Sequence, residues 1–270
     1  MSGAPESSPR SWAEVDLSAL RHNFSTAREL SGQQVMAVVK AGAYGHGLEA
    51  TARALASEEL AFFGVANVGE ARCLSEAGVD SPVYLLGATL PEERTEAVAL
   101  RCVPCLNTME EAHHFDQIAR DSGSPLRAHL AVDTGMGRGG FLPADVPAAL
   151  EAIRALSSVR VTGLGSHLPA ADEDSEFTHA QFNAFDTLVE SLPSRGELEF
   201  IHLANSAGLL GYRSRTTNLV RPGLLLYGVS PFGDEKTIFR TVMTLKSRIA
   251  VIREVPAGHG ISYGRTFLTT

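Results

Sequence analysis

The sequence predicts an α/β fold: a (β/α)8 barrel of the TIM type, followed by the start of a truncated β domain. Short apolar runs recur eight times before residue 222, and amphipathic segments with helical spacing separate most of them. Alternating strands and helices build parallel βαβ units, and eight units over roughly 200 residues fit a closed barrel. An open doubly wound sheet is the alternative, because periodicity alone does not show closure.

Each predicted strand is short and apolar, and the last is cut off by Pro222 and Gly223. The predicted strands span residues 35–39, 61–66, 82–86, 102–106, 127–132, 160–165, 199–203 and 219–221. The predicted helices span 17–30, 48–59, 67–78, 108–120, 144–157 and 176–191. Asp16 or Ser18 is expected to cap the first helix, since a short polar side chain there accepts from free backbone N–H groups.

The domain organisation follows from changes in composition. Residues 1–10 are polar and are expected to form a disordered N-terminal arm, and residues 11–235 form the barrel. Residues 236–270 are expected to begin a C-terminal β domain that is incomplete, with strands within 241–252 and after Gly260. Because two or three strands cannot bury a core, this tail is expected to pack on the barrel or a partner, or to belong to something longer.

Composition excludes several classes of function. The formal net charge of −8 argues against a general nucleic-acid binder, and no apolar stretch approaches the length of a membrane span. The N-terminus lacks the apolar core of a signal peptide, so a cytoplasmic location is expected. Cys102 and Cys105 form a C-x-x-C pair inside an apolar run with no second pair or histidine cluster, so we expect buried small side chains and no metal.

The most informative segment is the run from Val35 to Gly47, which places Lys40 at the end of a strand and follows it with a glycine-rich turn carrying Tyr44 and His46. A lysine amine that is desolvated at a strand end becomes a nucleophile suited to a Schiff base. The alternative is a lysine that reaches solvent from the end of the strand.

Polar residues follow several of the other predicted strands, and barrel enzymes keep their chemistry at that face. They are Asp133 to Arg138, Ser166 and His167, Asn205 and Ser206, and Arg221 and Gly223. The small residues on the last two strands suit a phosphate, which barrels commonly bind there. For Asn205 and Ser206 a simple helix cap is the alternative.

Together these segments resemble the alanine racemase family, whose members bind pyridoxal 5′-phosphate (PLP) on a fold-type III barrel. The resemblance covers about residues 11–267. Beyond the lysine segment its motifs lie at residues 132–138, 202–207, 220–223, 226–228, 245–249, 255–258 and 262–267. It implies an isomerase that interconverts L- and D-alanine by a two-base mechanism and supplies D-alanine for peptidoglycan.

The resemblance assigns a role to each site residue. Lys40 would hold PLP covalently and exchange the Cα proton on one face, and Tyr263 would be the base on the other face, donated across the interface of a homodimer. Arg138 would contact the substrate carboxylate or orient Tyr263. The remaining assignments concern the cofactor: Tyr44, Asn205, Ser206, Gly223 and Leu224 around the phosphate, His167 near the ring, and Arg221 facing the pyridine nitrogen.

Three departures from the family pattern matter. Ala131 stands where many members carry a lysine that becomes carbamylated and pairs with the arginine, so Arg138 is expected to find another partner, such as a bound anion or a nearby carboxylate, or to lose some rigidity. Gly42 replaces the usual aspartate or asparagine, from which only a looser turn is expected. The chain ends shortly after Tyr263, so the resemblance implies that most of the C-terminal β domain is missing.

Two other functions stay open. A PLP-binding barrel without racemase turnover, either a cofactor carrier or a decayed copy, is the first. A two-domain PLP decarboxylase of the same barrel type ranks last, since its long glycine-rich phosphate loop is not seen. The sequence does not distinguish alanine from serine as the preferred substrate.

Overall fold

The computed structural model describes residues 9–193, 195–233 and 238–270, so most of the expected disordered arm lies outside the described residues. The chain divides into two compact units. One is Val15–Val242, and the other joins the described residues before Val15 to Met243–Thr270. Compared with the sequence-based boundaries, residues 11–14 group with the C-terminal segment, and residues 238–242 group with the barrel.

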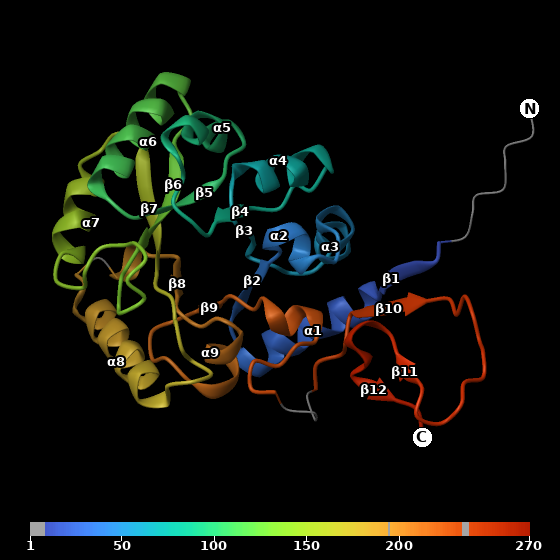
Figure 1. Cartoon of the computed structure of the whole chain (residues 1–270). Coiled ribbons are helices and arrows are strands. Elements are labelled where there is room, and N and C mark those ends of the chain that lie inside the picture. The colour runs from blue at the N-terminus through green and yellow to red at the C-terminus, as the bar shows by residue number, and fades with distance from the viewer. Residues whose placement is uncertain (1–8, 194, 234–237) are drawn as a thin grey trace, which may run out of the picture. The chain divides into compact units, whose positions relative to one another are not determined.

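The first unit is a closed barrel of eight strands, β2 to β9 in chain order (Figure 1). All neighbouring pairs are parallel, and β9 pairs with β2 to close the ring. The strands are β2 (Gln34–Val38), β3 (Phe62–Val65), β4 (Val83–Leu85), β5 (Val103–Leu106), β6 (Leu126–Ala131), β7 (Val159–Gly165), β8 (Phe200–His202) and β9 (Leu219–Val220). The barrel prediction is confirmed, and the open-sheet alternative is wrong.

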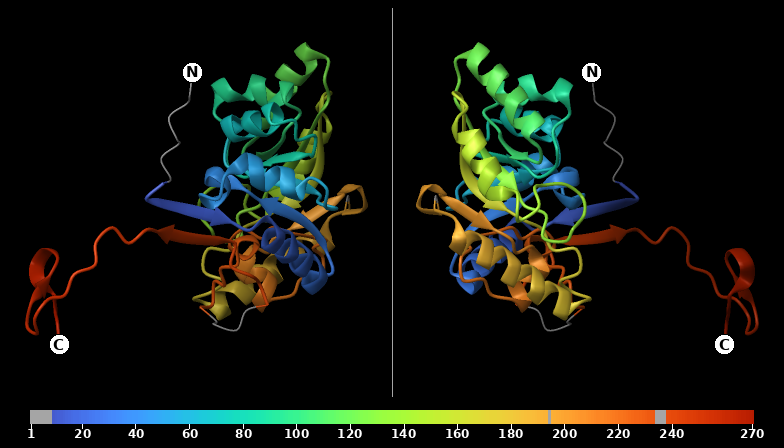
Figure 2. Two further views of the ribbon diagram at one scale, coloured as in Figure 1. Left: turned by 90° about the vertical axis from the view of Figure 1, so that its right-hand side faces the viewer. Right: turned by 90° about the vertical axis from the view of Figure 1, so that its left-hand side faces the viewer.

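Helices lie outside the strands of this unit, as two opposite views show (Figure 2). They are α1 (Leu17–Ser31), α2 (Lys40–Tyr44), α3 (Leu48–Leu55), α4 (Val68–Glu76), α5 (Arg94–Ala99), α6 (Met109–Ser122), α7 (Val146–Arg154), α8 (Ser175–Ser191) and α9 (Ser206–Gly211). Short 3-10 turns are η1 (Pro91–Glu93), η2 (Arg195–Glu197), η3 (Leu224–Tyr227) and η4 (Tyr263–Arg265). The short helices α5 and α9 were not expected, because six residues give too little periodicity to recognise.

Helix α1 precedes the first barrel strand and is hydrogen-bonded to the segment that follows the last one. Of the two expected caps, Asp16 is the one used: its carboxylate accepts from the N–H groups of Ser18 and Ala19. The buried Asn23 amide donates to the carbonyls of Leu226 and Arg240 and accepts from the Arg240 N–H. One side chain of α1 therefore fixes the segment that leaves the last strand.

Apolar side chains fill two layers of the barrel. The larger layer lies between strands and helices and includes Phe24, Phe63, Phe115 and Phe185, all essentially inaccessible to solvent. The smaller one fills the barrel interior with one side chain from each of five strands: Met36, Phe62, Tyr84, Val103 and Leu219. This interior layer supports the residues at the barrel mouth from below.

The second unit contains two small sheets. Strand β1 (Ser11–Val15) pairs with β10 (Met243–Ser247), and β11 (Gly260–Ile261) pairs with β12 (Phe267–Leu268). β10 lies inside the segment 241–252 that was expected to be β-rich, and Ile249, Val251 and Ile252, which follow it, are exposed. None of the described residues of this unit is buried, as expected for a few strands without a facing layer.

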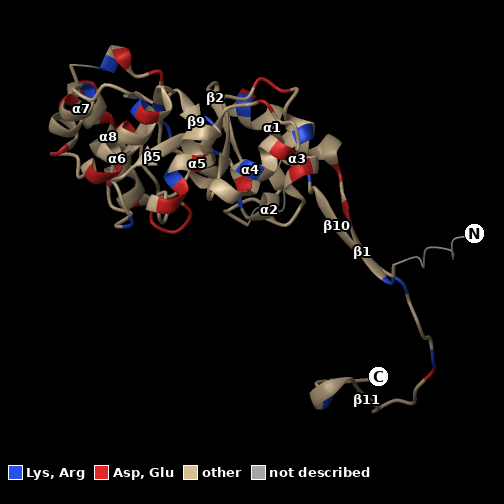
Figure 3. Ribbon diagram, turned by 90° about the horizontal axis from the view of Figure 1, so that it is seen from above, with Lys and Arg blue, Asp and Glu red and all other residues tan. Residues whose placement is uncertain are grey.

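No helix in the described part of the chain is long and apolar enough to cross a membrane. Lysine and arginine are interspersed with aspartate and glutamate over the helices of the barrel unit (Figure 3).

Candidate functional site

A cavity of about 620 Å³ opens at the carboxyl ends of the barrel strands. Nine of the ten residues predicted for the site line it: Lys40, Tyr44, Arg138, His167, Asn205, Ser206, Arg221, Gly223 and Leu224. The tenth, Tyr263, belongs to the second unit, where its side chain is 99% exposed. The structure thus brings residues from five separate strand ends together, while their roles stay predictions.

Lys40 leaves strand β2 at the start of an unusual turn. Ala41, Gly42 and Ala43 have φ of 54°, 62° and 59°, and Tyr44 has φ of 53°, so α2 is a left-handed turn and not an ordinary helix. This conformation costs roughly 1–2 kcal/mol for each residue that carries a Cβ. Glycine at position 42 avoids one of these costs, because it has no Cβ.

A hydrogen bond to helix α4 and a ring contact with η3 hold this turn in place. The Glu70 carboxylate accepts from the Gly42 N–H at 3.2 Å and from the Ala66 N–H at 2.8 Å. The Tyr44 ring packs on Tyr227 with centroids 5.1 Å apart. Strained backbone persists only where its surroundings hold it, and it clusters at functional sites. Lys40 itself is partly buried, so the expected desolvation of its amine stays a prediction.

The small residues after β8 and β9 form a cradle beside Tyr44. The Ser206 hydroxyl accepts from the N–H of Gly223 at 3.0 Å and of Leu225 at 3.3 Å. A hydroxyl has two lone pairs and one hydrogen, so these contacts leave its O–H as a donor. A Cβ on Gly223 would lie 2.5 Å from the Tyr44 hydroxyl oxygen, so only glycine allows this approach.

Asn205 acts locally as a helix cap. Its side-chain oxygen accepts from the Gly208 N–H at 3.0 Å, and its amide nitrogen donates to the Leu168 carbonyl at 3.2 Å. The plain helix-cap alternative is therefore present in the structure. The residue still lines the cavity, so the cap does not exclude the predicted role.

Arg221 is buried at the floor of the cavity, with 5% of its surface exposed. Its guanidinium donates to Nδ1 of His202 at 2.6 Å, to the Ser166 carbonyl at 2.7 Å and to Nδ1 of His167 at 3.0 Å. No carboxylate pairs with it among the described residues. Arg221 is therefore a cation without a carboxylate partner in the lining of the cavity.

The neighbouring histidines are neutral. Burial, helped by the charges of Arg221, Arg138 and Lys40, lowers the pKa of His167 to about 3. Burial and the nearby Arg221 also depress the pKa of His202 well below its usual value. Neutral rings can accept hydrogen bonds from Arg221, as the geometry requires.

Arg138 lies on the loop after β6, which Asp133 shapes by accepting from the N–H groups of Gly135 and Gly137. Across the described residues its guanidinium has no hydrogen bond and no ion pair, although it lines the cavity. Ala131 stands where the resemblance places a lysine, and no substitute partner for Arg138 is found among the described side chains. The free guanidinium can bind a carboxylate.

Sequence reasoning missed several residues of the barrel interior. Tyr84 and His202 are buried and line the cavity, and the buried His129 lies beyond the lining. The available signal was a histidine inside each of two apolar strands, at 127–132 and 199–203. Cys102 and Cys105 are unpaired, and burial raises the pKa of the Cys102 thiol to about 12, which keeps it unreactive.

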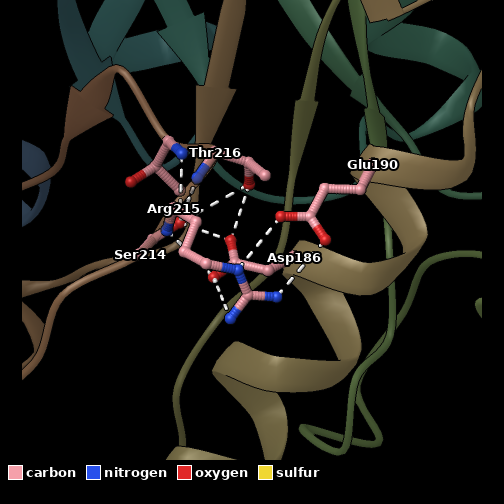
Figure 4. Close-up of polar contacts among 6 residues, drawn as sticks. Asp186, Glu190, Ser214, Arg215 and Thr216 are labelled. Atoms are coloured by element: carbon pink, nitrogen blue, oxygen red, sulfur yellow. Dashed lines mark hydrogen bonds and ion pairs between the residues drawn. The ribbon is translucent and has the colours of Figure 1, made fainter.

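A polar cluster anchors the segment that leads into β9 and Arg221 (Figure 4). The buried Asp186 carboxylate on α8 accepts from the hydroxyls of Ser214 and Thr216 at 2.5 and 2.6 Å and from the Arg215 N–H at 3.0 Å. The Arg215 side chain reaches Glu190 on the same helix at 3.0 Å. Helix α8 thereby fixes the approach to one edge of the site.

Comparison with known proteins gives a consistent family likeness. Residues 15–231 match the family described as "Alanine racemase, N-terminal domain". The chain is 37% identical over 265 residues to the alanine racemase of Carboxydothermus hydrogenoformans, covering 96% of this chain and 72% of that protein.

Solved structures give the same likeness in three dimensions. The alanine racemase of the D-cycloserine producer Streptomyces lavendulae is 35% identical, with a TM-score of 0.84 over 98% of this chain and 72% of that one. The alanine racemase of Bartonella henselae with covalently bound pyridoxal phosphate is 25% identical, with a TM-score of 0.83 over 97% of this chain and 73% of that one.

Proposed function

The chain belongs to the alanine racemase family, and from that premise we propose that it interconverts L- and D-alanine with PLP held covalently by Lys40. The observation that carries the proposal is the convergence of nine predicted residues on one cavity. Independent strand ends have no structural reason to supply a lysine, a buried arginine and a serine–glycine cradle to the same space.

The residues present fit this cofactor. The Ser206 hydroxyl keeps a free O–H, because both of its lone pairs already accept backbone N–H groups. Tyr44 presents a second hydroxyl directly opposite Gly223. Burial raises the pKa of Tyr44, so this hydroxyl stays protonated and able to donate to a phosphate oxygen.

When bound, PLP supplies an electron sink that weakens the Cα–H bond of an amino acid. Inversion needs one base to remove the proton and a second to return it to the opposite face. We assign the first to the Lys40 amine and the second to the Tyr263 hydroxyl. Arg138, the free cation at the cavity wall, binds the substrate carboxylate.

We assign Arg221 to the pyridine nitrogen. A guanidinium has only N–H donors and no proton to give at neutral pH, and its fixed charge disfavours protonation of a nearby nitrogen. The electron sink is thereby weakened, which shortens the lifetime of the deprotonated substrate and limits side reactions such as transamination.

The family also implies the setting of the reaction. We propose a cytoplasmic homodimer that provides D-alanine for peptidoglycan synthesis. In that dimer Tyr263 of one protomer serves the cavity of its partner, so its almost complete exposure within its own unit is what a residue donated across an interface needs.

Proton NMR in D2O with added PLP tests the activity. L-Alanine is followed for Cα deuteration and for formation of D-alanine. Deuteration with inversion supports two acting bases. Deuteration without inversion contradicts the role of Tyr263 and leaves a PLP-binding barrel without racemase turnover. Lys40→Ala is expected to abolish the visible absorbance of the lysine-bound cofactor, and an unchanged spectrum contradicts the assignment of Lys40.

Tyr263→Phe separates the two faces of the substrate. This variant is expected to slow deuterium exchange from L-alanine more than from D-alanine, because only one face loses its base. Equal losses for the two enantiomers contradict the division of roles, and the unchanged equilibrium constant serves as the internal check on the rates.

Mixing two inactive variants tests the donation across the dimer. A heterodimer of Lys40→Ala and Tyr263→Phe contains one cavity with both bases only if Tyr263 acts in the partner's site. Recovered racemase activity on mixing supports this arrangement. A mixed dimer that stays inactive, when isolated with two different affinity tags, contradicts it.

A further inference from the structure

Three side chains form a line of hydrogen bonds from the cavity floor into the barrel interior. The Arg221 guanidinium donates to Nδ1 of His202 at 2.6 Å, and Nε2 of His202 lies 2.9 Å from Nδ1 of His129. All three are buried, with 5%, 2% and 0% of their surface exposed. The line is therefore shielded from bulk solvent.

The line has one direction, because arginine is a donor only. Nδ1 of His202 must be unprotonated to accept from Arg221, so the proton of this neutral ring sits on Nε2. That Nε2–H then donates to His129, whose Nδ1 must be unprotonated in turn. Reversing either histidine would place two N–H groups against each other.

The line of hydrogen bonds ends at the Nε2–H group of His129, which is a donor. Nε2 of His129 has no hydrogen-bond partner among the described residues. The ring is instead surrounded by aromatic side chains, with the Phe62 centroid at 5.4 Å and an interplanar angle of 86°, and the Tyr84 centroid at 5.0 Å. An aromatic face can receive an N–H weakly. It cannot donate a hydrogen bond. In the opposite tautomer Nε2 of His129 would be a bare acceptor with no donor near it in the described part of the chain, so the surroundings of His129 do not favour that tautomer.

Two glycines on β7 make room for the rings. A Cβ on Gly163 would lie 2.6 Å from the His129 ring, and one on Gly165 would overlap His202. Gly163 and Gly165 are two residues apart along the strand, so both face the same side, which is the barrel interior. Glycine weakens a strand, and here it lets the two imidazoles lie against the β7 backbone.

We propose that His129 is a positioning residue for Arg221, which it orients by holding His202 in the Nε2-protonated form. Three of the five guanidinium N–H bonds are held by His202, Ser166 and His167. The remaining two, one of them on Nε, are therefore fixed in direction. The consequence for catalysis rests on the proposed function, whereas the tautomers do not.

Burial and the charges of Arg127 and Arg221 lower the pKa of His129 to about 3. The ring is thus neutral at neutral pH. A histidine that remains neutral and in one tautomer is suited to orient a cation without adding a charge beside it.

Nitrogen-15 NMR of protein labelled at histidine tests the arrangement directly, without cofactor. Protonated and bare imidazole nitrogens resonate in separate regions of the spectrum. We expect His202 and His129 to show a bare Nδ1 and a protonated Nε2, assigned by loss of the His129 signals in its variants. A protonated Nδ1 on either ring overturns the proposal.

A pair of variants tests the positioning role. His129→Asn keeps an acceptor oxygen near the place of Nδ1, whereas His129→Leu has similar size and no acceptor. In His129→Leu we expect the His202 tautomer to become mixed and kcat to fall about tenfold, and in His129→Asn to stay within about threefold of the parent. Equal behaviour of the two variants, or an unchanged His202 tautomer in His129→Leu, overturns the role.

Two controls keep the outcome interpretable. Thermal unfolding shows whether each variant is folded, and if His129→Leu is not, the tautomers of the parent and of His129→Asn still decide the question. If the parent protein shows no racemisation, the proposed function fails, while the nitrogen-15 spectra of the cofactor-free protein still support or overturn the hydrogen-bond line.

Discussion

Gly165 lies directly opposite His202 in the pairing of β7 with β8, and a Cβ atom at Gly165 would overlap the imidazole of His202. Because both residues are buried, Gly165→Ala must displace the ring or the strand. We expect a loss of about 1–3 kcal/mol in the free energy of unfolding, together with weaker cofactor binding. Urea denaturation measures the first and absorbance titration the second.

Gly196→Ala provides the matched control, since no atom lies within 4 Å of the Cβ it would add. Its expected effect is within about 0.5 kcal/mol. If Gly165→Ala were as mild as this control, the close packing of His202 against β7 would be contradicted.

The left-handed turn after Lys40 gives a second prediction. Gly42 has φ of 62° and open space around its missing Cβ, so Gly42→Ala changes backbone strain and little else. We expect a loss of about 1 kcal/mol in unfolding free energy. Ala41→Gly, at the neighbouring position with φ of 54°, is expected to shift stability the other way. A change of the same sign in both variants would contradict strain as the cause.

The fold was predictable because hydrophobic spacing depends on burial, and the barrel buries every strand. All eight predicted strands agree with the observed ones to within one residue at each end. Strand β1 escaped prediction because Ser11–Val15 carries Trp12 and Val15 among polar neighbours and is nowhere buried. Strand β1 is formed by pairing with β10, which lies more than 200 residues later in the sequence, so the local pattern of residues 11–15 does not reveal it.

The candidate site was predictable where chemistry lies at strand ends and unpredictable inside the barrel. Lys40 and Arg221 stand out in sequence because a charged residue beside a buried strand needs an explanation. His129 looks like one polar residue in an apolar run, and only its distance to His202 gives it a partner. The left-handed turn was likewise hidden, since alanine at positions 41 and 43 gives no sign of positive φ.

The Asp186 cluster of Figure 4 gives a third prediction. Asp186→Ala leaves the Ser214 and Thr216 hydroxyls and the Arg215 N–H without their acceptor. We expect a loss of about 2–4 kcal/mol in unfolding free energy. Glu190→Ala, which removes only an exposed ion pair with Arg215, is expected to cost less than about 1 kcal/mol. Equal losses in the two variants would contradict the anchoring role of Asp186.

The buried histidines give a fourth prediction, for stability against pH. The pKa of His129 is about 3 in the folded protein, against about 6.5 in an unfolded chain. Below pH 6.5 the unfolded chain therefore binds a proton that the folded protein excludes, and stability falls as pH falls towards 3. Each such histidine contributes at most about 1.4 kcal/mol per pH unit. Urea denaturation of the parent and of His129→Asn measures the slope, which the variant reduces. The same slope in both proteins would mean that folding does not lower the pKa of His129. Its ring would then be protonated below about pH 6.5 in the folded protein and could not accept a hydrogen bond from His202.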